Sequence, residues 1–322
     1  MLVTFAGSPD RVEAQLVPDA GYELDTFRIA GLPRRPSPAL VSSVLLAGHA
    51  PLACARILAR RRPDVVLGGG GYVSGPMVYA AWRKRTPAAL EESDARLGLA
   101  NRLAARFAQR IFLAYELPDR GGAKYRVVGR PIPEQARPLD RAVARAQLGL
   151  PADGPVLLIA GARAGAQALN ELAIESFGAV GPAVLHVCGE RDYGALRRRV
   201  SRPEYRLVPV LDGLGAAYGA CDLAIMRSGG TVWELAAAGL PAILVPYPFA
   251  TGDHQTLNAR HFAQGGGAIH VPETELGHVP ELARSLLDDA DRLVLMGQRM
   301  RELARPDAAR VIAEELIALA AA

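Results

Sequence analysis

The sequence predicts an α/β protein with two doubly wound domains, each a parallel sheet covered by helices. Nine short apolar runs recur along the chain, and most are continuous, as expected for strands buried on both faces of a parallel sheet. Stretches with helical periodicity separate most of these runs, and such an alternation is typical of the doubly wound architecture. The length of 322 residues fits two domains.

Each apolar run marks an expected strand. In chain order the strands are Leu2–Ala6, Asp64–Gly68, Arg110–Ala114, Val156–Gly161, Ala183–Gly189, Arg206–Leu211, Leu223–Met226, Ala242–Pro246 and Ala268–Pro272. Apolar residues at helical spacing predict helices between them, for example over Leu97–Ala108, Gln167–Phe177 and Val232–Ala238.

Prolines indicate where the domains join. They cluster between residues 130 and 155, which favours an interdomain connection with one short helix, and Pro306 marks a second joint before an amphipathic tail. We therefore expect an N-terminal domain at 1–135, a C-terminal domain at 136–305, and a helix at 306–322 that packs back on the first domain.

Composition narrows the functional classes. The chain is 50% hydrophobic and 22% charged, which is ordinary for a globular protein. Its net charge of +4 is carried almost entirely by arginine and suits anionic small ligands or an anionic membrane surface better than nucleic acid. Three separated cysteines and six histidines without ligand spacing predict no disulfide framework and no metal site. The sequence has no apolar run of 18 residues, so we expect no transmembrane helix. Its first residues lack the basic start and apolar stretch of a secretory signal, so we expect no such signal.

A first glycine-rich stretch follows the strand at 64–67. It runs from Gly68 to Gly75, and a helix is expected from about Pro76. Glycines let backbone N–H groups approach a ligand, and the start of a helix attracts anions. The alternative is a tight turn without a ligand. The residues expected to face an anionic ligand are Gly69, Gly70, Gly71, Tyr72, Ser74 and Gly75.

Two further strands of the second half also end in small residues. After Val156–Ala160 comes a loop in which Arg163 could face an anion, although such loops often serve only close packing. After Leu223–Met226 come Arg227 and a Ser-Gly-Gly-Thr stretch, and Arg227 is a second candidate donor to an anion. Thr231 and Glu234 fit a capping box, and Glu234 could alternatively accept hydrogen bonds from the vicinal hydroxyls of a ribose.

A polar cluster follows the strand at 242–245. Asp253, His254 and Gln255 lie where a loop enters a helix and offer donors and acceptors suited to sugar hydroxyls. Asp253 has the alternative role of helix cap. His254 and Gln255 have a solvated helix start as their alternative.

Five stretches of the chain resemble the MurG family, bacterial transferases that move GlcNAc from UDP-GlcNAc to lipid I and form lipid II in peptidoglycan synthesis. In collinear order between about residues 2 and 320 they are RVEAQLVPDAGYELDTFRIAGLPRR, GGYVSGP, ARLGLANRLAARFAQR, GARAGAQALN and RSGGTVWELAAAGLPAILVPYPFATGDHQTLNA. The resemblance implies a GT-B fold, two Rossmann-like domains facing across a cleft. It further implies inversion at the sugar, no cofactor besides the substrate UDP-GlcNAc, a lipid-linked acceptor on the N-terminal domain, and a peripheral location at the cytoplasmic face of the plasma membrane.

The resemblance also implies roles for individual residues. Glu234 matches the residue that holds the ribose, Gln255 the one that contacts GlcNAc hydroxyls, and Leu211 an apolar residue beside uracil. Gly68–Gly75 match the loop facing the acceptor pyrophosphate. The full donor set is Arg163, Leu211, Gly229, Gly230, Thr231, Val232, Trp233, Glu234, His254 and Gln255.

The chain departs from the family pattern at several positions. It lacks the opening GGTxGHxxPA loop and begins at the family's second strand, which predicts about one βα unit fewer. Arg163 replaces a serine, Pro133 replaces an arginine although Arg130 is close, and Glu91 replaces the histidine of an HEQN segment. Glu92 matches the glutamate of that segment and Asp94 its asparagine.

The general base is left unassigned, with Glu92 and Asp94 as candidates. Two alternatives stay open for the whole protein. One is a related glycosyltransferase with another lipid or natural-product acceptor, and the other is an inactive sugar-nucleotide-binding paralogue or fragment.

A lipid acceptor requires a surface that meets the membrane. One candidate is an apolar helix at Ala39–Leu46, flanked by Arg34, Arg35, Arg56 and Arg60–Arg62. The other is an aromatic and basic tip formed by Trp82, Arg83, Lys84 and Arg85. An apolar face with a cationic rim is typical of interfacial binding. The alternative is a core-facing helix with solvated arginines.

Overall fold

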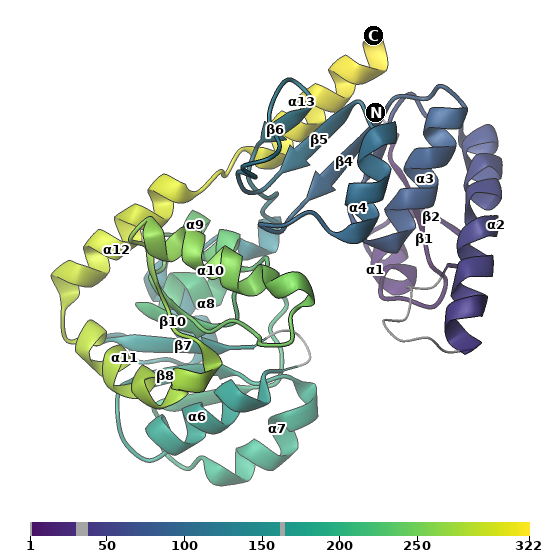
Figure 1. Ribbon diagram of the computed structural model, residues 1–322. Coiled ribbons are helices and arrows are strands. Elements are labelled where there is room, and N and C mark those ends of the chain that lie inside the picture. Colours follow the sequence, from purple (N-terminus) through teal and green to yellow (C-terminus); the bar gives the residue numbers. More distant parts are fainter. Residues whose placement is uncertain (1, 30–37, 162–164) are drawn as a thin grey trace. The chain divides into compact units, whose positions relative to one another are not determined.

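The computed structural model describes residues 2–29, 38–161 and 165–322, and it describes no side chains at 38–45 or 47. The chain divides into two compact units (Figure 1). The first comprises Met1–Val128 and Arg310–Ala322, and the second comprises Gly129–Ala309. These boundaries lie a few residues from those expected from the proline pattern.

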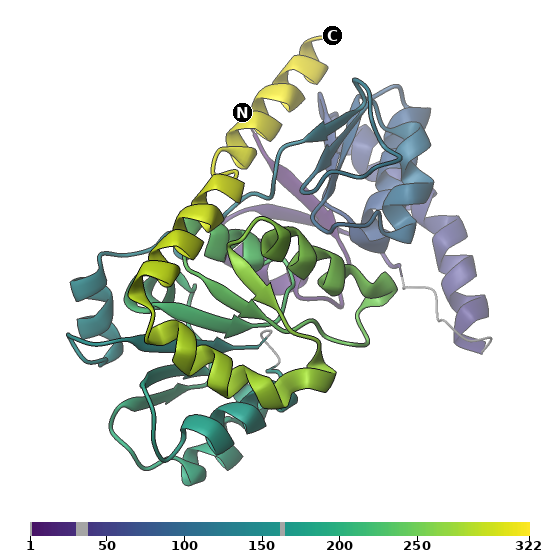
Figure 2. The same cartoon turned by 60° about the vertical axis from the view of Figure 1, so that its left-hand side comes forward.

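The first unit contains two parallel sheets. Strands β1 (Thr4–Gly7) and β2 (Glu23–Thr26) pair with each other and are joined by α1 (Glu13–Asp19) (purple in Figure 2). The second sheet has the order β3-β4-β5-β6, with β3 at Val66–Gly68, β4 at Ala88–Glu92, β5 at Arg110–Leu113 and β6 at Tyr125–Val127. Besides α1, the helices before β6 are α2 (Pro38–Arg61), α3 (Gly71–Arg83) and α4 (Leu99–Ala104).

Apolar side chains of α2 and α3 form the core of the first unit. Cys54 and Leu58 of α2 pack with Val78 and Ala81 of α3 and with Ile111 of β5, and all of them are buried. Burial raises the pKa of the Cys54 thiol to about 12, so this cysteine behaves as a small apolar residue.

The last helix, α13 (Ala308–Ala321), contributes to the first unit from residue 310 onward (yellow, Figure 2). Ile312 is buried in a cluster with Ala89 of β4 and Phe112 of β5. Glu315 forms ion pairs with Arg110 at 3.0 Å and with Arg126 at 3.1 Å. The C-terminal helix therefore covers part of the β3-β4-β5-β6 sheet of the first unit.

The second unit contains one six-stranded parallel sheet with the order β12-β11-β10-β7-β8-β9. Its strands are β7 (Val156–Ala160), β8 (Ala183–Val187), β9 (Tyr205–Val208), β10 (Leu223–Met226), β11 (Ala242–Leu244) and β12 (Ala268–His270). The chain proceeds outward from β7 to β9 and then returns to β10 on the other side of β7. This reversal of strand order is a topological switch point, where ligands bind beyond the carboxyl ends of the strands.

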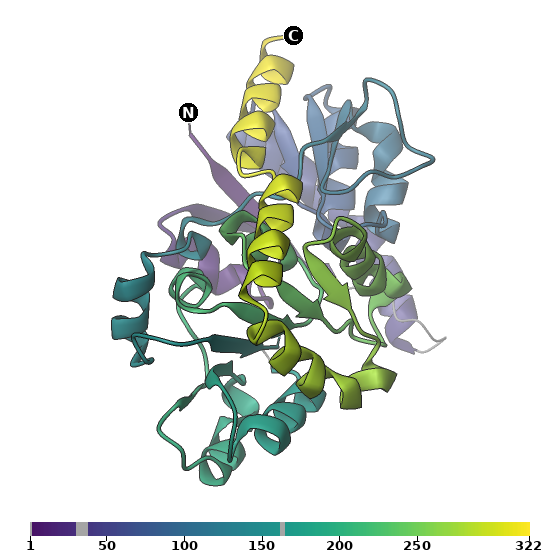
Figure 3. The ribbon, with the colours of Figure 1, turned by 90° about the vertical axis from the view of Figure 1, so that its left-hand side faces the viewer.

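Helices cover both faces of this sheet. Figure 1 shows α6 (Gln167–Phe177) and α11 (Val279–Leu287) on one face and α8 (Gly215–Ala220) and α9 (Val232–Ala238) on the other. The remaining helices are α5 (Arg141–Leu148), α7 (Glu190–Leu196), α10 (His254–Gln264) and α12 (Ala290–Leu303, Figure 3). Strands β7, β10 and β11 are buried along their whole length, as their continuous apolar runs predict, whereas the edge strands β9 and β12 are partly exposed.

All nine expected strands are present, and the structure adds β2, β4 and β6 in the first unit. The added strands have the sequences ELDT, AALEE and YRV. Charged residues and alanines dilute their apolar pattern, so periodicity alone does not identify them.

Candidate functional site

The carboxyl edge of the second sheet brings two of the predicted stretches together. Residues 227–231 follow β10 and residues 246–255 follow β11, so both loops emerge at the same edge. The Ser228 hydroxyl donates to the carbonyl of Gln255 at 2.8 Å, and the Asn258 amide donates to the carbonyl of Ser228 at 3.1 Å. Asn258 is fully buried. The contact between the two loops is therefore part of the fold itself.

Gln255 lies beside the glycine pair of the first loop. Its Oε1 accepts a hydrogen bond from the Tyr247 N–H at 2.9 Å, which fixes the orientation of the amide. A Cβ built on Gly229 would lie 4.0 Å from Gln255 Nε2, so the donor end of the amide is next to this glycine. The His254 Nδ1 lies 2.9 Å from the Thr251 carbonyl, which can only accept, so Nδ1 carries the proton.

Asp253 precedes α10 in the left-handed region, with φ of 56°. Its carboxylate accepts from the Thr256 hydroxyl at 2.6 Å and makes no cap to the helix backbone. Asp253 therefore occupies the N-cap position of α10, but its side chain makes no hydrogen bond to the helix backbone.

Glu234 does not form the expected capping box. The Thr231 side chain makes no hydrogen bond to the start of α9, and Oε2 of Glu234 accepts from the Tyr218 hydroxyl at 2.8 Å. No described residue donates to Oε1. Burial raises the pKa of Glu234, and the Tyr218 hydrogen bond and the positive charge of Arg130 partly oppose this rise. One oxygen is thus held by the protein while the other is uncommitted.

The side chains of Val232 and Trp233 belong to the core. Their exposed fractions are 0% and 2%, and the Trp233 ring packs edge-on against Phe262 with centroids 5.3 Å apart. The sequence expectation that these two residues bind a donor is therefore limited to their backbone, because their side chains support α9 from behind.

Arg130 lies at this site, although the sequence indicated it only as a cation close to Pro133. Its guanidinium lies directly against Gly230, because a Cβ on this glycine would be 1.0 Å from Nη1. Any side chain at position 230 would collide with it. Positions 130 and 230 are far apart in sequence, so no local pattern reveals the contact.

The Arg227 guanidinium is engaged in the fold. It donates to the carbonyls of Val245 at 3.2 Å and Pro246 at 3.1 Å, and it forms an ion pair with Glu273. Only 8% of the residue is exposed. These contacts hold the Arg227 side chain against the loop that follows β11, so its role as a donor to a bound anion stays a prediction.

The loop after β7 is tightly packed where it is described, and Arg163 itself lies outside the described residues. A Cβ on Gly161 would lie 2.5 Å from the Ala166 nitrogen, and one on Gly165 would lie 2.5 Å from the Cys188 carbonyl oxygen. Close packing therefore explains both glycines. Leu211 is half-buried, and its carbonyl accepts from the Gly213 N–H at 2.9 Å in the turn that follows β9.

A buried polar chain supports this loop from behind. His186 contacts the Tyr205 hydroxyl at 2.8 Å and Asn170 Oδ1 at 2.9 Å, and Asn170 donates to Asp192 at 2.8 Å. Because Asn170 Oδ1 can only accept, His186 Nε2 carries the proton. Burial lowers the pKa of His186 to about 4, so the ring is neutral at pH 7.

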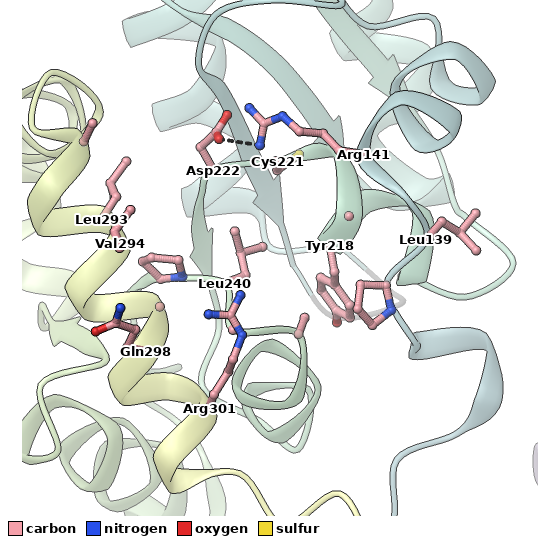
Figure 4. Close-up of a pocket in the computed structure, with 17 residues that line it drawn as sticks. Leu139, Arg141, Tyr218, Cys221, Asp222, Leu240, Leu293, Val294, Gln298 and Arg301 are labelled. Carbon is pink, nitrogen blue, oxygen red and sulfur yellow. Dashed lines mark ion pairs between the residues drawn. The ribbon is translucent and has the colours of Figure 1, made fainter.

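Tyr218 also lines a cavity of about 550 Å³ at the opposite edge of the sheet (Figure 4). This cavity lies at the amino ends of β10 and β11 and is bordered by Leu240, Arg301 and the Arg141–Asp222 ion pair, whose atoms are 2.7 Å apart. The Tyr218 side chain therefore separates the cavity from Glu234.

In the first unit, the glycine stretch enters its helix earlier than expected. Helix α3 begins at Gly71 rather than near Pro76, so Tyr72, Ser74 and Gly75 are helical. Gly70 and Gly71 have φ of 88° and 67°, values that L side chains rarely adopt. The Ser74 hydroxyl donates back to the Gly70 carbonyl and closes this turn.

Glu92 lies at the end of β4 beside the same turn. Its carboxylate accepts from the Gly98 N–H at 2.8 Å, from the Asn101 amide at 3.0 Å and from the Asp94 N–H at 3.3 Å. A Cβ on Gly70 would lie 3.8 Å from the Asn101 amide nitrogen, which places the glycine turn next to this network. Burial raises the pKa of Glu92, and the three hydrogen bonds oppose the rise.

The aromatic tip forms a cluster on the surface of the first unit. Trp82 is 49% exposed, and its ring lies 5.8 Å from that of Tyr79 and 5.0 Å from that of Phe107. The Arg106 guanidinium lies 4.9 Å over the Phe107 ring, and Arg83 and Lys84 are exposed. We call Tyr79, Trp82, Phe107 and the cations Arg83, Lys84, Arg85 and Arg106 the aromatic-basic patch.

In the other membrane candidate, the helix at Ala39–Leu46 with its flanking arginines, two of the arginines are paired within the protein. Arg60 and Arg61 form ion pairs with Asp25, at 2.5 Å and 2.7 Å, and hold α2 to β2. Arg34 and Arg35 lie outside the described residues, as do the side chains of the apolar segment up to Leu45.

The described part of the chain contains neither a membrane-spanning helix nor a cluster of metal ligands. None of its helices has the length and apolar character needed to cross a bilayer. Within residues 2–29, 38–161 and 165–322 no group of three or more metal-binding side chains is gathered.

Comparisons with known proteins agree over both units. Residues 2–113 match the glycosyltransferase family 28 N-terminal domain and residues 156–314 match the glycosyltransferase family 28 C-terminal domain. A protein of Salinibacter ruber named UDP-N-acetylglucosamine–N-acetylmuramyl-(pentapeptide) pyrophosphoryl-undecaprenol N-acetylglucosamine transferase is 39% identical over 99% of this chain and 88% of its own length. Its namesake in Thermobifida fusca is 38% identical over 98% of this chain and 85% of its own length. The crystal structure of Acinetobacter baumannii MurG superposes with a TM-score of 0.76 at 27% identity, covering 98% of this chain and 90% of that one.

Proposed function

Because this chain belongs to glycosyltransferase family 28 and within it to the MurG transferases, we propose that it transfers GlcNAc from UDP-GlcNAc to lipid I and so forms lipid II. The observation that carries the proposal is the carboxyl edge of the second sheet. There a glycine turn, a glutamate with one uncommitted oxygen and a fixed glutamine amide gather at a topological switch point.

In the donor site, each of these groups binds a different part of UDP-GlcNAc. Glu234 Oε1 accepts hydrogen bonds from the ribose hydroxyls, while Tyr218 holds Oε2 and fixes the carboxylate. The Gln255 amide and the free Nε2 of His254 serve the GlcNAc hydroxyls. Gly229, Gly230 and Thr231 offer backbone N–H groups, and Leu211 offers an apolar surface to uracil.

In the acceptor site, the turn at Gly69–Gly71 and the start of α3 bind the pyrophosphate of the acceptor. This is supported by the positive φ of Gly70 and Gly71 and by α3, a helix of 13 residues whose first N–H groups attract anions. Glu92 keeps the neighbouring turn in shape through its three hydrogen bonds.

The reaction exchanges one C–O bond for another at the sugar. The acceptor hydroxyl oxygen attacks C1 of GlcNAc, the bond from C1 to the diphosphate oxygen breaks, and its electron pair leaves with UDP. The hydroxyl proton passes to a general base. We assign this role to Asp94 rather than Glu92, because both oxygens of Glu92 already accept hydrogen bonds in a buried site, whereas Asp94 is less buried.

No metal is needed in this scheme, since protein cations and backbone N–H groups would balance the charge of the diphosphate. Turnover that persists in excess chelator would support this point, and strict dependence on an added divalent cation would refute it.

The aromatic-basic patch would hold the enzyme at the cytoplasmic face of the membrane as a peripheral protein. Its exposed Trp82 and the surrounding cations suit the interface of an anionic bilayer. Replacing Trp82 and Lys84 by serine should reduce sedimentation with vesicles containing phosphatidylglycerol. Unchanged sedimentation would show that another surface binds the membrane.

A transfer assay tests the whole proposal. The protein is incubated with labelled UDP-GlcNAc and a short-chain lipid I analogue, with UDP-glucose, UDP-GalNAc and an acceptor lacking the peptide as comparisons. We expect labelled disaccharide product with UDP-GlcNAc and the lipid I analogue, and much less with the other pairs. UDP-GlcNAc binding without product would favour a non-catalytic protein, and faster transfer to a different acceptor would favour another glycosyltransferase.

A further inference from the structure

The second unit holds one arginine in an unusual position. The Arg130 guanidinium occupies the space that a side chain on Gly230 would need, with Nη1 at 1.0 Å, Cζ at 2.1 Å and Nη2 at 2.8 Å from an ideal Cβ. The guanidinium therefore lies on the backbone of the glycine turn that follows β10. Gly230 is the residue that makes this contact possible.

The backbone around Arg130 is fixed. Gly129 has φ of 83°, and a Cβ there would collide with the Arg305 side chain at 2.2 Å and approach the Trp233 ring at 3.5 Å. Pro131 follows directly and restricts its own φ. Close packing at Gly129 and the ring of Pro131 thus constrain the backbone on both sides of Arg130.

The charge of Arg130 is available. No carboxylate among the described residues forms an ion pair with it, in contrast to Arg227 and Arg145 of the same unit. Its positive charge also lowers the pKa of Glu234, against the larger rise that burial causes. A cation and a carboxylate at the same turn suit two adjacent parts of a nucleotide, because the ribose carries the diphosphate.

We propose that Arg130 binds the diphosphate of the nucleotide donor and stabilises the leaving UDP. This inference rests on the proposed function. A guanidinium presents a planar fork of N–H donors that matches phosphate oxygens, and its charge opposes the negative charge that grows when the C1–O bond breaks.

A ligand series separates this role from a structural one. Uridine, UMP and UDP are titrated calorimetrically into the wild-type protein, Arg130→Gln and Arg130→Lys. We expect Arg130→Gln to weaken UDP binding by about 10- to 100-fold, the range for a lost charge-assisted hydrogen bond, while uridine binding changes little. Arg130→Lys should recover part of the affinity. If Arg130 only steadied Glu234, uridine, UMP and UDP would all lose affinity by the same factor, and the proposal would be wrong.

Arg301→Gln is the matched control. Arg301 also lies against a glycine, Gly239, but at the other end of α9, with its Nε 2.4 Å from an ideal Cβ. We expect this variant to bind UDP as the wild type does. If the wild-type protein does not bind UDP at all, the proposed donor is wrong. If the wild type and Arg130→Gln bind UDP equally well, the donor stands and the role of Arg130 is wrong.

A double-mutant cycle with Gly230→Ala gives a second test that does not depend on the charge. The added methyl group displaces the flexible end of Arg130 rather than backbone. We expect Gly230→Ala to weaken UDP binding in the wild type and to add little in Arg130→Gln. Losses that add fully would mean that the methyl group obstructs the ligand directly, and would contradict the role of Arg130.

Discussion

The two units use one device, a glycine turn after a parallel strand, but they commit the neighbouring glutamate differently. In the first unit Glu92 accepts hydrogen bonds at both oxygens from Gly98, Asn101 and Asp94. In the second unit Glu234 is held at one oxygen by Tyr218. Burial raises the pKa of both. A buried glutamate beside a loop thus stabilises the loop when both of its oxygens accept hydrogen bonds from the protein. It can bind a ligand when one oxygen has no donor within the protein.

The largest effect should come from Glu92→Ala. It would remove the buried carboxylate that accepts three hydrogen bonds, one of them fully buried, so we expect the free energy of unfolding to fall by about 2–3 kcal/mol. Urea denaturation measures this change. Glu91→Ala, at the adjacent position, should cost less, and an equal loss in both variants would remove the distinction drawn for Glu92.

Glu234→Ala should act on the ligand rather than on the fold. We expect UDP binding to weaken by about 1–3 kcal/mol, because two ribose hydroxyls lose their acceptor, with little change in thermal stability. Calorimetric titration with UDP checks this, and Glu175→Ala on the exposed face of α6 is the control. Unchanged affinity in Glu234→Ala would contradict the ribose contact.

A smaller effect is expected from Tyr218→Phe, which sharpens the comparison because it frees the second oxygen of Glu234. The loss of one hydrogen bond that fixes the carboxylate should weaken UDP binding by about 1 kcal/mol. Tyr193→Phe, a half-buried tyrosine of α7, serves as control. A gain in affinity would show that Tyr218 competes with the ligand for Glu234.

The pH dependence should be the smallest effect near neutrality. The folded-state pKa of Glu234 is raised above its ordinary value of 4.5, so its charged form costs folding free energy at neutral pH and this cost disappears as the pH falls through the raised pKa. Ligand binding has the opposite sign, since the ribose needs the carboxylate. As the pH is lowered, the UDP affinity of the wild type should therefore begin to fall while the pH is still above 4.5. The affinity of Glu234→Gln, titrated in parallel, should not show this fall. Parallel curves for the two proteins would contradict this assignment.

The sheet of the second unit could be predicted from sequence because its strands are continuous apolar runs with both faces buried. Strand β4 could not, since Ala88–Glu92 mixes alanine with charge and owes its place to pairing with β3 and β5. The turns of the candidate sites were predictable from glycine, but partners distant in sequence were not. Tyr218 takes the hydrogen bond that a capping box would have given Glu234, and Arg130 reaches Gly230 only through the tertiary fold.

Helix α13 has a consequence for the order in which the chain can be assembled on the ribosome. Phe112 and Ala89 belong to the part of the protein synthesised first, yet Ile312, which covers them, emerges only after the entire second unit has been translated. The apolar surface around Ala89 and Phe112 therefore stays exposed while the second unit is being translated. A nascent chain halted at residue 128 should be more dependent on chaperones than one that includes helix α13.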